Sequence, residues 1–246
     1  MQDEHNLEEK VLSQGAEMML SQGLDEVEKI DINVQTDLFK ILQGQADGVS
    51  FAGEGLVIQE DIRVQEIKLQ TDNIDINPLT ALFGQIELNQ PVNATVRVVL
   101  TESDINRALA SDLVRSKPQK FDLKVDEEIV SFEAKQIQVF LPGEGKMAFQ
   151  GTVLLHEVGN TRQLSFTAII RPRTHSQPII LESFSCNEGE GISLEIVVAL
   201  MQKVKELVNL PYLQYEDTVF SVKKLEVEKD RMILLVQTKL KQIPSL

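Results

Sequence analysis

Residues 62–76, IRVQEIKLQTDNIDI, decide the fold because their apolar side chains recur at every second position. The first apolar positions, Ile62 and Val64, are even-numbered, whereas the next two, Ile67 and Leu69, are odd-numbered. Successive side chains of a strand point to opposite faces, so this change reverses the face that is buried. The segment therefore predicts a β-strand with a bulge around Gln65 and Glu66, in a long sheet that bends there.

The same alternation continues on both sides of this segment and predicts an antiparallel sheet. The strand-like stretches are 30–34, 74–76, 86–88, 92–98, 121–125, 129–134, 137–141, 147–149, 153–155 and 164–170, with a closing hairpin of 219–227 and 232–240 that turns near 228–231. Three glycine clusters, at 53–55, 143–146 and 189–191, match no phosphate-loop spacing and are predicted to be turns.

Three segments show helical periodicity instead. They are residues 7–27, residues 101–111 with Thr101 as a capping residue, and residues 188–210, which form the strongest helix. Acidic residues begin the third segment and Pro211 ends it. Its apolar face is wide enough to be covered by a sheet.

The fold class predicted from these patterns is α+β, with a long curved antiparallel sheet and a long amphipathic helix. The chain has 246 residues, and we expect one domain, 1–246, whose halves 1–111 and 112–246 are loosely similar in the order of their elements.

Composition excludes several function classes. The net charge is −14 and the chain has no tryptophan, which argues against nucleic-acid binding, because phosphate contacts need clustered Lys and Arg. The same charge opposes electrostatic adsorption to an anionic membrane, so any membrane contact is expected to be local and apolar. We expect a cytoplasmic location or one at the periphery of a membrane, and a periplasmic location if the natural chain carries an export signal.

The search for reactive groups is negative. The three histidines, His5, His156 and His175, lack the spacing of a metal site, and the single cysteine, Cys186, lies among acidic residues that would not activate a thiol. No GxSxG nucleophile motif is present. We therefore predict no catalytic residues, no metal and no cofactor, and a protein that is not an enzyme. An esterase is the least favoured alternative.

Five segments in order carry a resemblance to a known family. They are TDLFKILQG at 36–44, GVSFAGEGL at 48–56, IKLQTDNIDI at 67–76, NPLTALFGQIEL at 77–88 and TESDINRALAS at 101–111. In these segments, about a third of the chain, the sequence resembles the LmeA-like family of bacterial phospholipid-binding proteins. The resemblance implies a fold like that of the tubular lipid-binding proteins, in which a curved sheet wraps around a long helix beside an apolar groove, and it implies non-catalytic lipid binding.

A groove of this kind would hold phospholipid or another acyl lipid and could serve in its transfer. Candidate groove residues come from two oily segments and from the third helix: Leu38, Phe39, Leu82, Phe83, Ile196, Leu200, Met201 and Val204. Arg171 and Arg173 are weak candidates for contact with a lipid head group. The alternative is a protein-interaction or scaffold module, whose core is filled by its own side chains and whose acidic surface binds a basic partner.

Overall fold

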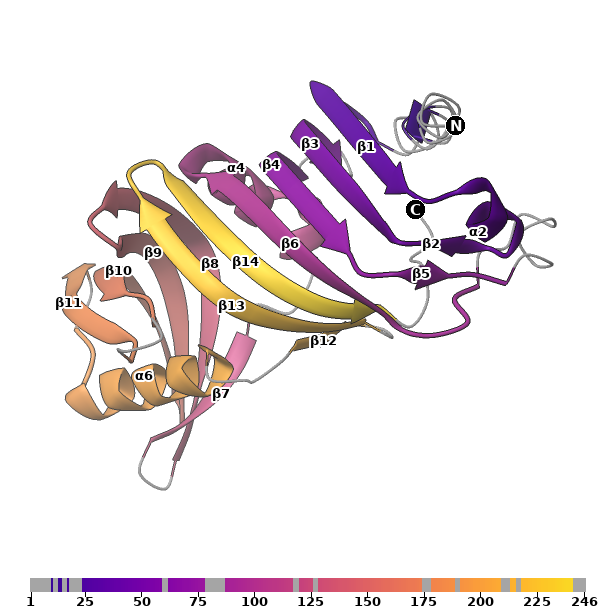
Figure 1. Ribbon diagram of the computed structural model, residues 1–246. Coiled ribbons are helices and arrows are strands. Elements are labelled where there is room, and N and C mark those ends of the chain that lie inside the picture. Colours follow the sequence, from indigo (N-terminus) through magenta and orange to yellow (C-terminus); the bar gives the residue numbers. More distant parts are fainter. Residues whose placement is uncertain are drawn as a thin grey trace. The chain divides into compact units, whose positions relative to one another are not determined.

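The computed structural model describes residues 10, 13–14, 17, 24–58, 62–77, 87–116, 120–125, 128–173, 178–188, 191–208, 213–215 and 218–240 (Figure 1). The chain divides into two compact units. The first unit comprises Met1–Leu100, Pro211–Lys224 and Ile233–Leu246, and the second comprises Thr101–Leu210 and Leu225–Met232. The tip of the closing hairpin, Leu225–Met232, therefore belongs to the second unit, and the rest of the hairpin belongs to the first.

The first unit is built on an antiparallel sheet. In space the described strands follow the order β1-β3-β4-β6-β14-β13-β12. Their bounds are β1 Lys29–Gln35, β3 Gly48–Ile58, β4 Ile62–Thr71, β6 Val92–Thr101, β12 Leu213–Tyr215, β13 Thr218–Glu228 and β14 Arg231–Leu240. Strand β1 is followed by a helix of five residues, α2 Leu38–Leu42, and by the short strand β2 Gln45–Ala46. Strand β2 pairs with β5 Ile74–Asp75, which follows β4, in a small separate sheet (Figure 1). The LFKIL segment is thus a short helix.

The predicted change of buried face is found in β4, but its cause differs from the prediction. Strands β3 and β4 keep one register from Ser50↔Gln70 to Glu54↔Glu66, and the same register resumes at Leu56↔Val64. The bulge predicted around Gln65 and Glu66 is therefore wrong, because the register of β4 against β3 does not shift there. The buried face changes at Gly55, whose φ is +60°. Gly55 lies inside β3, so the turn predicted at 53–55 is wrong. A Cβ on Gly53 would lie 2.8 Å from Leu56, so these two positions share a face on either side of Gly55.

Strand β1 is an edge strand whose backbone donors are satisfied by side chains from the N-terminal segment. Ile32 N–H donates to Glu17 Oε1 at 3.2 Å, and Val34 N–H donates to Ser13 Oγ at 3.4 Å. Residues 10, 13, 14 and 17 are helical, as predicted for 7–27, but residues 24–27 are not: Glu26 forms a β-bridge with Val57, so the predicted end of this helix is wrong. The remaining residues of the predicted helix lie outside the described ranges. Covering an edge in this way protects it from pairing with another chain.

The helix predicted at 101–111 is confirmed as α4, Glu102–Ala110. Thr101 Oγ1 accepts the backbone N–H of Asp104 and the Asp104 side chain accepts the N–H of Thr101, which is a capping box. The chain turns at Ser111 into the short helix α5, Asp112–Arg115.

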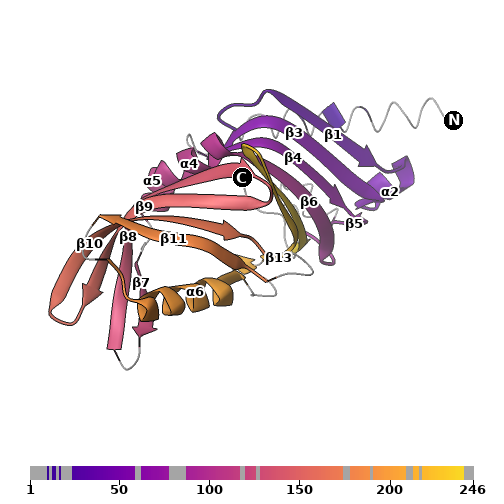
Figure 2. The same cartoon turned by 90° about the vertical axis from the view of Figure 1, so that its left-hand side faces the viewer.

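The second unit is an antiparallel sheet with α6 against one face (Figure 2). The order of its described strands is β11-β10-β9-β8-β7. Their bounds are β7 Lys120–Val125, β8 Glu128–Gly143, β9 Lys146–Glu157, β10 Asn160–Arg171 and β11 Ile180–Glu188, and α6 is Leu194–Val208. The turn predicted at 143–146 joins β8 to β9.

The third predicted helix is shorter than expected. Helix α6 has 15 residues, because Glu188 pairs with Ser165 as the last residue of β11, a strand that the alternation did not reveal. The chain is α+β with mostly antiparallel sheet, as predicted, but the expectation of a long amphipathic helix is not supported.

Candidate functional site

Helix α6 covers one end of the apolar face of the second sheet. Ile196, which is 3% exposed, packs in a buried cluster with Leu123, Val130, Phe132, Val153, Leu155 and Leu164. Leu200 and Ala199 are half-buried against the same cluster. The three residues follow helical spacing, so one side of α6 faces the sheet.

A pocket of about 490 Å³ opens beside the N-terminal end of α6, and we call it the α6 pocket. It is lined by Val125, Glu128, Val130, Glu157, Val158, Ser193 and Ile196. Val130 and Ile196 also belong to the buried cluster, so the floor of the pocket is continuous with the apolar core. The α6 pocket is therefore an opening between the helix and the sheet.

Carboxylates line the mouth of the α6 pocket. Glu157 forms an ion pair with Arg162, whose Nε and Nη2 donate to its two oxygens at 3.1 and 3.0 Å. Arg162 Nη1 also donates to the carbonyl oxygen of Gly191 at 2.7 Å, which ties β10 to the segment that leads into α6. Glu128 is exposed. The rim thus combines a neutralised Glu157 with an accessible carboxylate at Glu128.

Large apolar side chains are exposed around this mouth. Val158 lines the pocket and is 78% exposed, and Leu194, next to Ser193, is 72% exposed. Ile129 is also 63% exposed, but it alternates with Glu128 and Val130 in β8 and therefore points to the opposite face of the sheet. Apolar residues on this scale of exposure, gathered at an opening to an apolar core, are typical of a surface that meets an apolar ligand or membrane.

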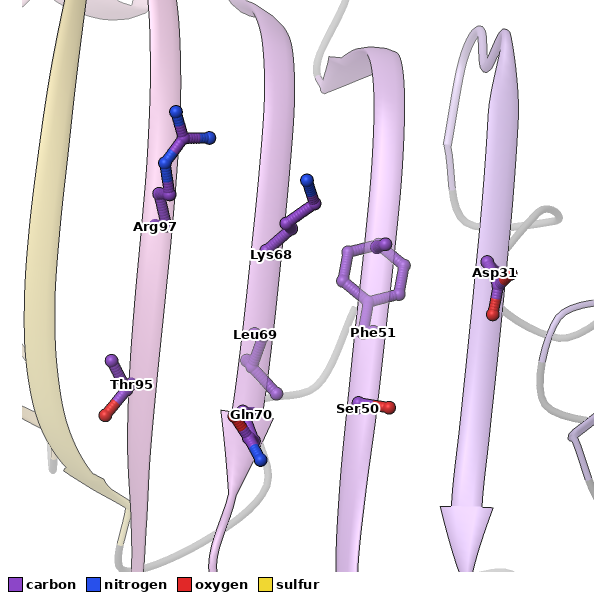
Figure 3. Close-up of a pocket in the computed structure, with 9 residues that line it drawn as sticks. Asp31, Ser50, Phe51, Lys68, Leu69, Gln70, Thr95 and Arg97 are labelled. Atoms are coloured by element: carbon purple, nitrogen blue, oxygen red, sulfur yellow. The ribbon is translucent and has the colours of Figure 1, made fainter.

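A second pocket, of about 300 Å³, lies on the first sheet (Figure 3). Pairing places Asp31, Ala52, Lys68 and Arg97 in one row across β1, β3, β4 and β6, and Ser50, Gln70 and Thr95 in the next row on the same face. Both cations are engaged, because Lys68 Nζ and Arg97 Nη1 lie 2.8 and 2.7 Å from Glu66 Oε1. The two cations of this pocket, which we call the polar pocket, are therefore paired, and Phe51 and Leu69 also line it.

The opposite face of the first sheet is apolar and half-buried. Ile32, Phe51, Leu69 and Val96 form a row across the same four strands. Ile32 is buried, whereas Phe51, Leu69 and Val96 are only half-buried. This face is a second apolar surface in the chain, and two of its residues, Phe51 and Leu69, are also among those that line the polar pocket.

The structure does not bring together a catalytic centre in either pocket. His156 Nε2 lies 2.8 Å from Glu133 Oε2 and its Nδ1 lies 3.1 Å from Thr161 Oγ1, but none of the three lines a pocket described above. Burial raises the pKa of the Cys186 thiol, which keeps it protonated and unreactive. Within the described ranges, no cluster of three His, Cys, Asp or Glu side chains could hold a metal ion. In the same ranges no helix has the length and apolar character needed to cross a membrane.

The predicted residues of the first oily segment lie on α2. Phe39 is 76% exposed, and Leu42, one turn later, is 72% exposed. Between them Lys40 donates to Asp47 at 2.6 Å, and this hydrogen bond raises the pKa of the lysine. The side chain of Leu38, and Leu82 and Phe83 entirely, lie outside the described residues, so their assignment to a groove stays a prediction.

Of the predicted residues on the third helix, the structure brings Ile196 and Leu200 together against the core, and Ile196 also lines the α6 pocket. Met201 is half-buried and follows helical spacing with Leu194 and Val198, on the side of α6 away from Ile196. The side chain of Val204 lies outside the described residues. Helix α2 belongs to the first unit and α6 to the second.

The two candidate head-group residues lie at the end of β10, with Arg171 as its last residue and Arg173 two residues later. Arg171 donates from Nε to Glu182 Oε1 at 3.0 Å, and Lys146 Nζ lies 3.1 Å from Glu182 Oε2. Arg171 is thus held by an ion pair within the sheet. Arg173 is exposed and also has an interaction partner. Neither arginine lines a pocket described above.

Sequence reasoning missed the other residues of the α6 pocket. They come from the ends of β7, β8 and β9 and from the residue before α6: Val125, Glu128, Val130, Glu157, Val158 and Ser193. The sequence pattern that these residues share is a change from alternating apolar residues to acidic ones. This pattern is common at strand ends, so it does not mark a pocket.

Comparison with known proteins extends the resemblance seen in residues 31–111. The family model described as LmeA-like phospholipid-binding matches residues 4–237, which is nearly the whole chain. The comparisons with curated proteins and with solved structures gave no match. The chain belongs to the LmeA-like phospholipid-binding family.

Proposed function

We propose that the chain binds a phospholipid without catalysis and that an acyl chain enters the α6 pocket. One observation carries this proposal: Val130 and Ile196 belong both to the pocket and to the buried apolar cluster. An apolar chain that enters between α6 and the sheet would therefore meet apolar side chains along its path. A 15-residue helix is long enough to form this wall, so the proposal does not need the long helix expected from the sequence.

The size and chemistry of the pocket support a lipid ligand. Its volume of about 490 Å³ is in the range of small-molecule sites, which are mostly apolar with a few polar groups at fixed places. Its polar groups are two carboxylates and one hydroxyl, and its lining contains no histidine, cysteine or lysine. These residues suit binding and provide no nucleophile paired with a base.

Energetics favour reversible exchange with a membrane. Moving an acyl chain of about sixteen carbons from water to an apolar site gains on the order of 10 kcal/mol, at roughly 0.8 kcal/mol per methylene. Moving the same chain from a bilayer gains almost nothing, since both environments are apolar. The protein would thus take up lipid from a membrane and return it without ATP while at the periphery of that membrane. Such reversible exchange is the property expected of a lipid carrier.

Two matched substitutions test the site. Glu128→Trp places a large side chain at the mouth of the α6 pocket, and Asp31→Trp does the same at the polar pocket of the first unit. Both positions are exposed carboxylates, so each variant loses one negative charge without disturbing a buried residue. Delipidated wild-type protein and both variants are titrated with a fluorescent phosphatidylcholine, and organic extracts of the purified proteins are analysed by mass spectrometry.

The proposal predicts phospholipid in the wild-type extract and uptake of the fluorescent lipid that Glu128→Trp weakens at least about tenfold, the effect of losing about 1.4 kcal/mol of binding. Asp31→Trp should bind like the wild type. Equal binding by both variants would move the site away from α6. An unliganded wild-type protein that also rejects added lipid would favour the scaffold alternative.

A further inference from the structure

Helix α6 is apolar on both of its long sides over its first two turns. Residues 196–201, IVVALM, contain no polar side chain. Ile196, Ala199 and Leu200 face the sheet, where they pack on the buried cluster. A surface helix of a globular protein is expected to carry polar residues on its other side. Helix α6 departs from this pattern.

The side of α6 away from the sheet carries an apolar stripe. We define the outer stripe as Leu194, Val197, Val198 and Met201, which follow the spacing of one helix side. Leu194 is 72% exposed and Val198 is 57% exposed, and Val197 and Met201 are half-buried. The described structure therefore leaves an uncharged apolar surface in water along the helix, which is unfavourable unless another apolar phase covers it.

The outer stripe begins beside the α6 pocket. Leu194 follows the lining residue Ser193 directly, at the N-terminal end of α6. Val158, which lines the pocket from the end of β9, is exposed to a similar degree. Exposed apolar side chains of α6 and of the end of β9 thus lie near one opening.

We infer that the outer stripe of α6 is the surface by which this protein docks on a phospholipid bilayer. The inference rests on the proposed function, because it assigns the stripe to the opening through which lipid would pass. A helix side is convex and fits a flat, deformable interface, where apolar side chains sink into the boundary between head groups and acyl chains. The ligand of the family resides in such a bilayer, so docking here brings the opening to its source.

Charge determines the kind of bilayer. The chain has a net charge of −14, and Glu195 and Glu128 are exposed beside the stripe and the opening. Anionic lipids would be repelled by these groups, while the stripe itself carries no charge. Docking is therefore by apolar insertion and needs no anionic lipid.

A pair of double variants tests the docking surface. Leu194→Glu with Val198→Glu places two carboxylates on the outer stripe. The control, Ile129→Glu with Val222→Glu, makes the same change on β8 and β13, at apolar side chains that are 63% and 51% exposed. None of the four residues lines a pocket described above or belongs to a buried cluster. Binding to phosphatidylcholine vesicles is measured by flotation, with and without added phosphatidylglycerol.

The inference predicts that the stripe variant loses vesicle binding at least about tenfold, since inserting even one large apolar side chain is worth more than about 1.4 kcal/mol. The control variant should keep wild-type binding, and phosphatidylglycerol should not strengthen the binding of either protein. Three results would each overturn the inference: wild-type protein that does not bind vesicles, a stripe variant that floats like the wild type, or loss of binding in the control variant instead.

Two further measurements separate docking from lipid binding and from self-association. Binding of short-chain phosphatidylcholine, below the concentration at which it forms micelles, measures lipid binding to the pocket in the absence of a membrane. The stripe variant should bind this lipid like the wild type. If the wild type floats with vesicles but rejects the short-chain lipid, the proposed function fails while docking stands. If the wild type is a dimer that the stripe variant dissociates with vesicle binding unchanged, the stripe is an interface between copies and the inference is wrong.

Discussion

Asn106 of α4 hydrogen-bonds both backbone groups of Val139 in β8. The Val139 N–H donates to Asn106 Oδ1 at 2.8 Å, and Asn106 Nδ2 donates to the carbonyl oxygen of Val139 at 2.7 Å. Strand β7 pairs with β8 only from Glu128 to Glu133, so Val139 lies on a part of the edge that β7 does not reach. One amide side chain takes the place of a neighbouring strand there.

Replacing Asn106 should destabilise the second unit. Asn106→Ala leaves the N–H and the carbonyl of a buried residue without these partners, which costs about 1–3 kcal/mol. The midpoint of urea unfolding should fall with little change in slope. The neighbouring exposed residue provides a control, since Arg107→Ala should change stability by less than about 0.5 kcal/mol. Equal effects of the two substitutions would contradict the role given to Asn106.

Gly55 should tolerate a side chain less well than a glycine with the same backbone conformation in a turn. At Gly55, with φ of +60°, an added Cβ would lie within 2.5 Å of three atoms of the Glu28 side chain, which pairs with Arg63 at 2.9 Å. At Gly159, with φ of +76°, an added Cβ would meet no atom within 4 Å. Gly159→Ala should therefore cost about 1 kcal/mol of strain, and Gly55→Ala more. Thermal unfolding of both variants checks this order, which equal losses would contradict.

Stability should fall in acid partly through Glu182. Hydrogen bonds from Arg171 and then Lys146 hold the pKa of this carboxyl below its ordinary value of 4.5. A depressed pKa gives stability that is present above the unfolded value and is lost as the pH falls through the folded value. Glu182→Gln should therefore flatten the decline of unfolding free energy below about pH 4.5, as measured by urea unfolding at a series of pH values. An unchanged acid limb in Glu182→Gln would contradict this assignment.

Local signals in the sequence were sufficient for several elements. Thr101, as a capping residue before an acidic first turn, marked the start of α4, and the structure shows a capping box between Thr101 and Asp104. The closing hairpin turns at Lys229 and Asp230, where polar residues interrupt two apolar runs. In these cases the decisive interactions join residues close together in the chain, so pattern and structure agree.

Non-local pairing set the features that the sequence did not reveal. The register between β10 and β11 shifts twice, after Ser165 and after Ile169, and these shifts disrupt the alternation in β11. Without that strand, Glu188 reads as the start of a helix. The α6 pocket likewise joins strand ends and a helix that are far apart in sequence, and no periodicity predicts which of them meet. Ile196 was found because it lies on the apolar side of a strong helical pattern.

The most direct test of the central claim, that an acyl chain enters beside α6, uses the absence of tryptophan from the chain. Val158→Trp places a single fluorophore at the mouth of the α6 pocket. As comparisons, Val222→Trp places one at a half-exposed position on β13, and Phe51→Trp places one on the apolar face of the first sheet. Each variant is titrated with phosphatidylcholine brominated on an acyl chain, because bromine quenches tryptophan only at close range. We predict strong quenching at position 158 and little at position 222. Quenching at position 51 with none at position 158 would contradict the claim and place the acyl chain on the first sheet.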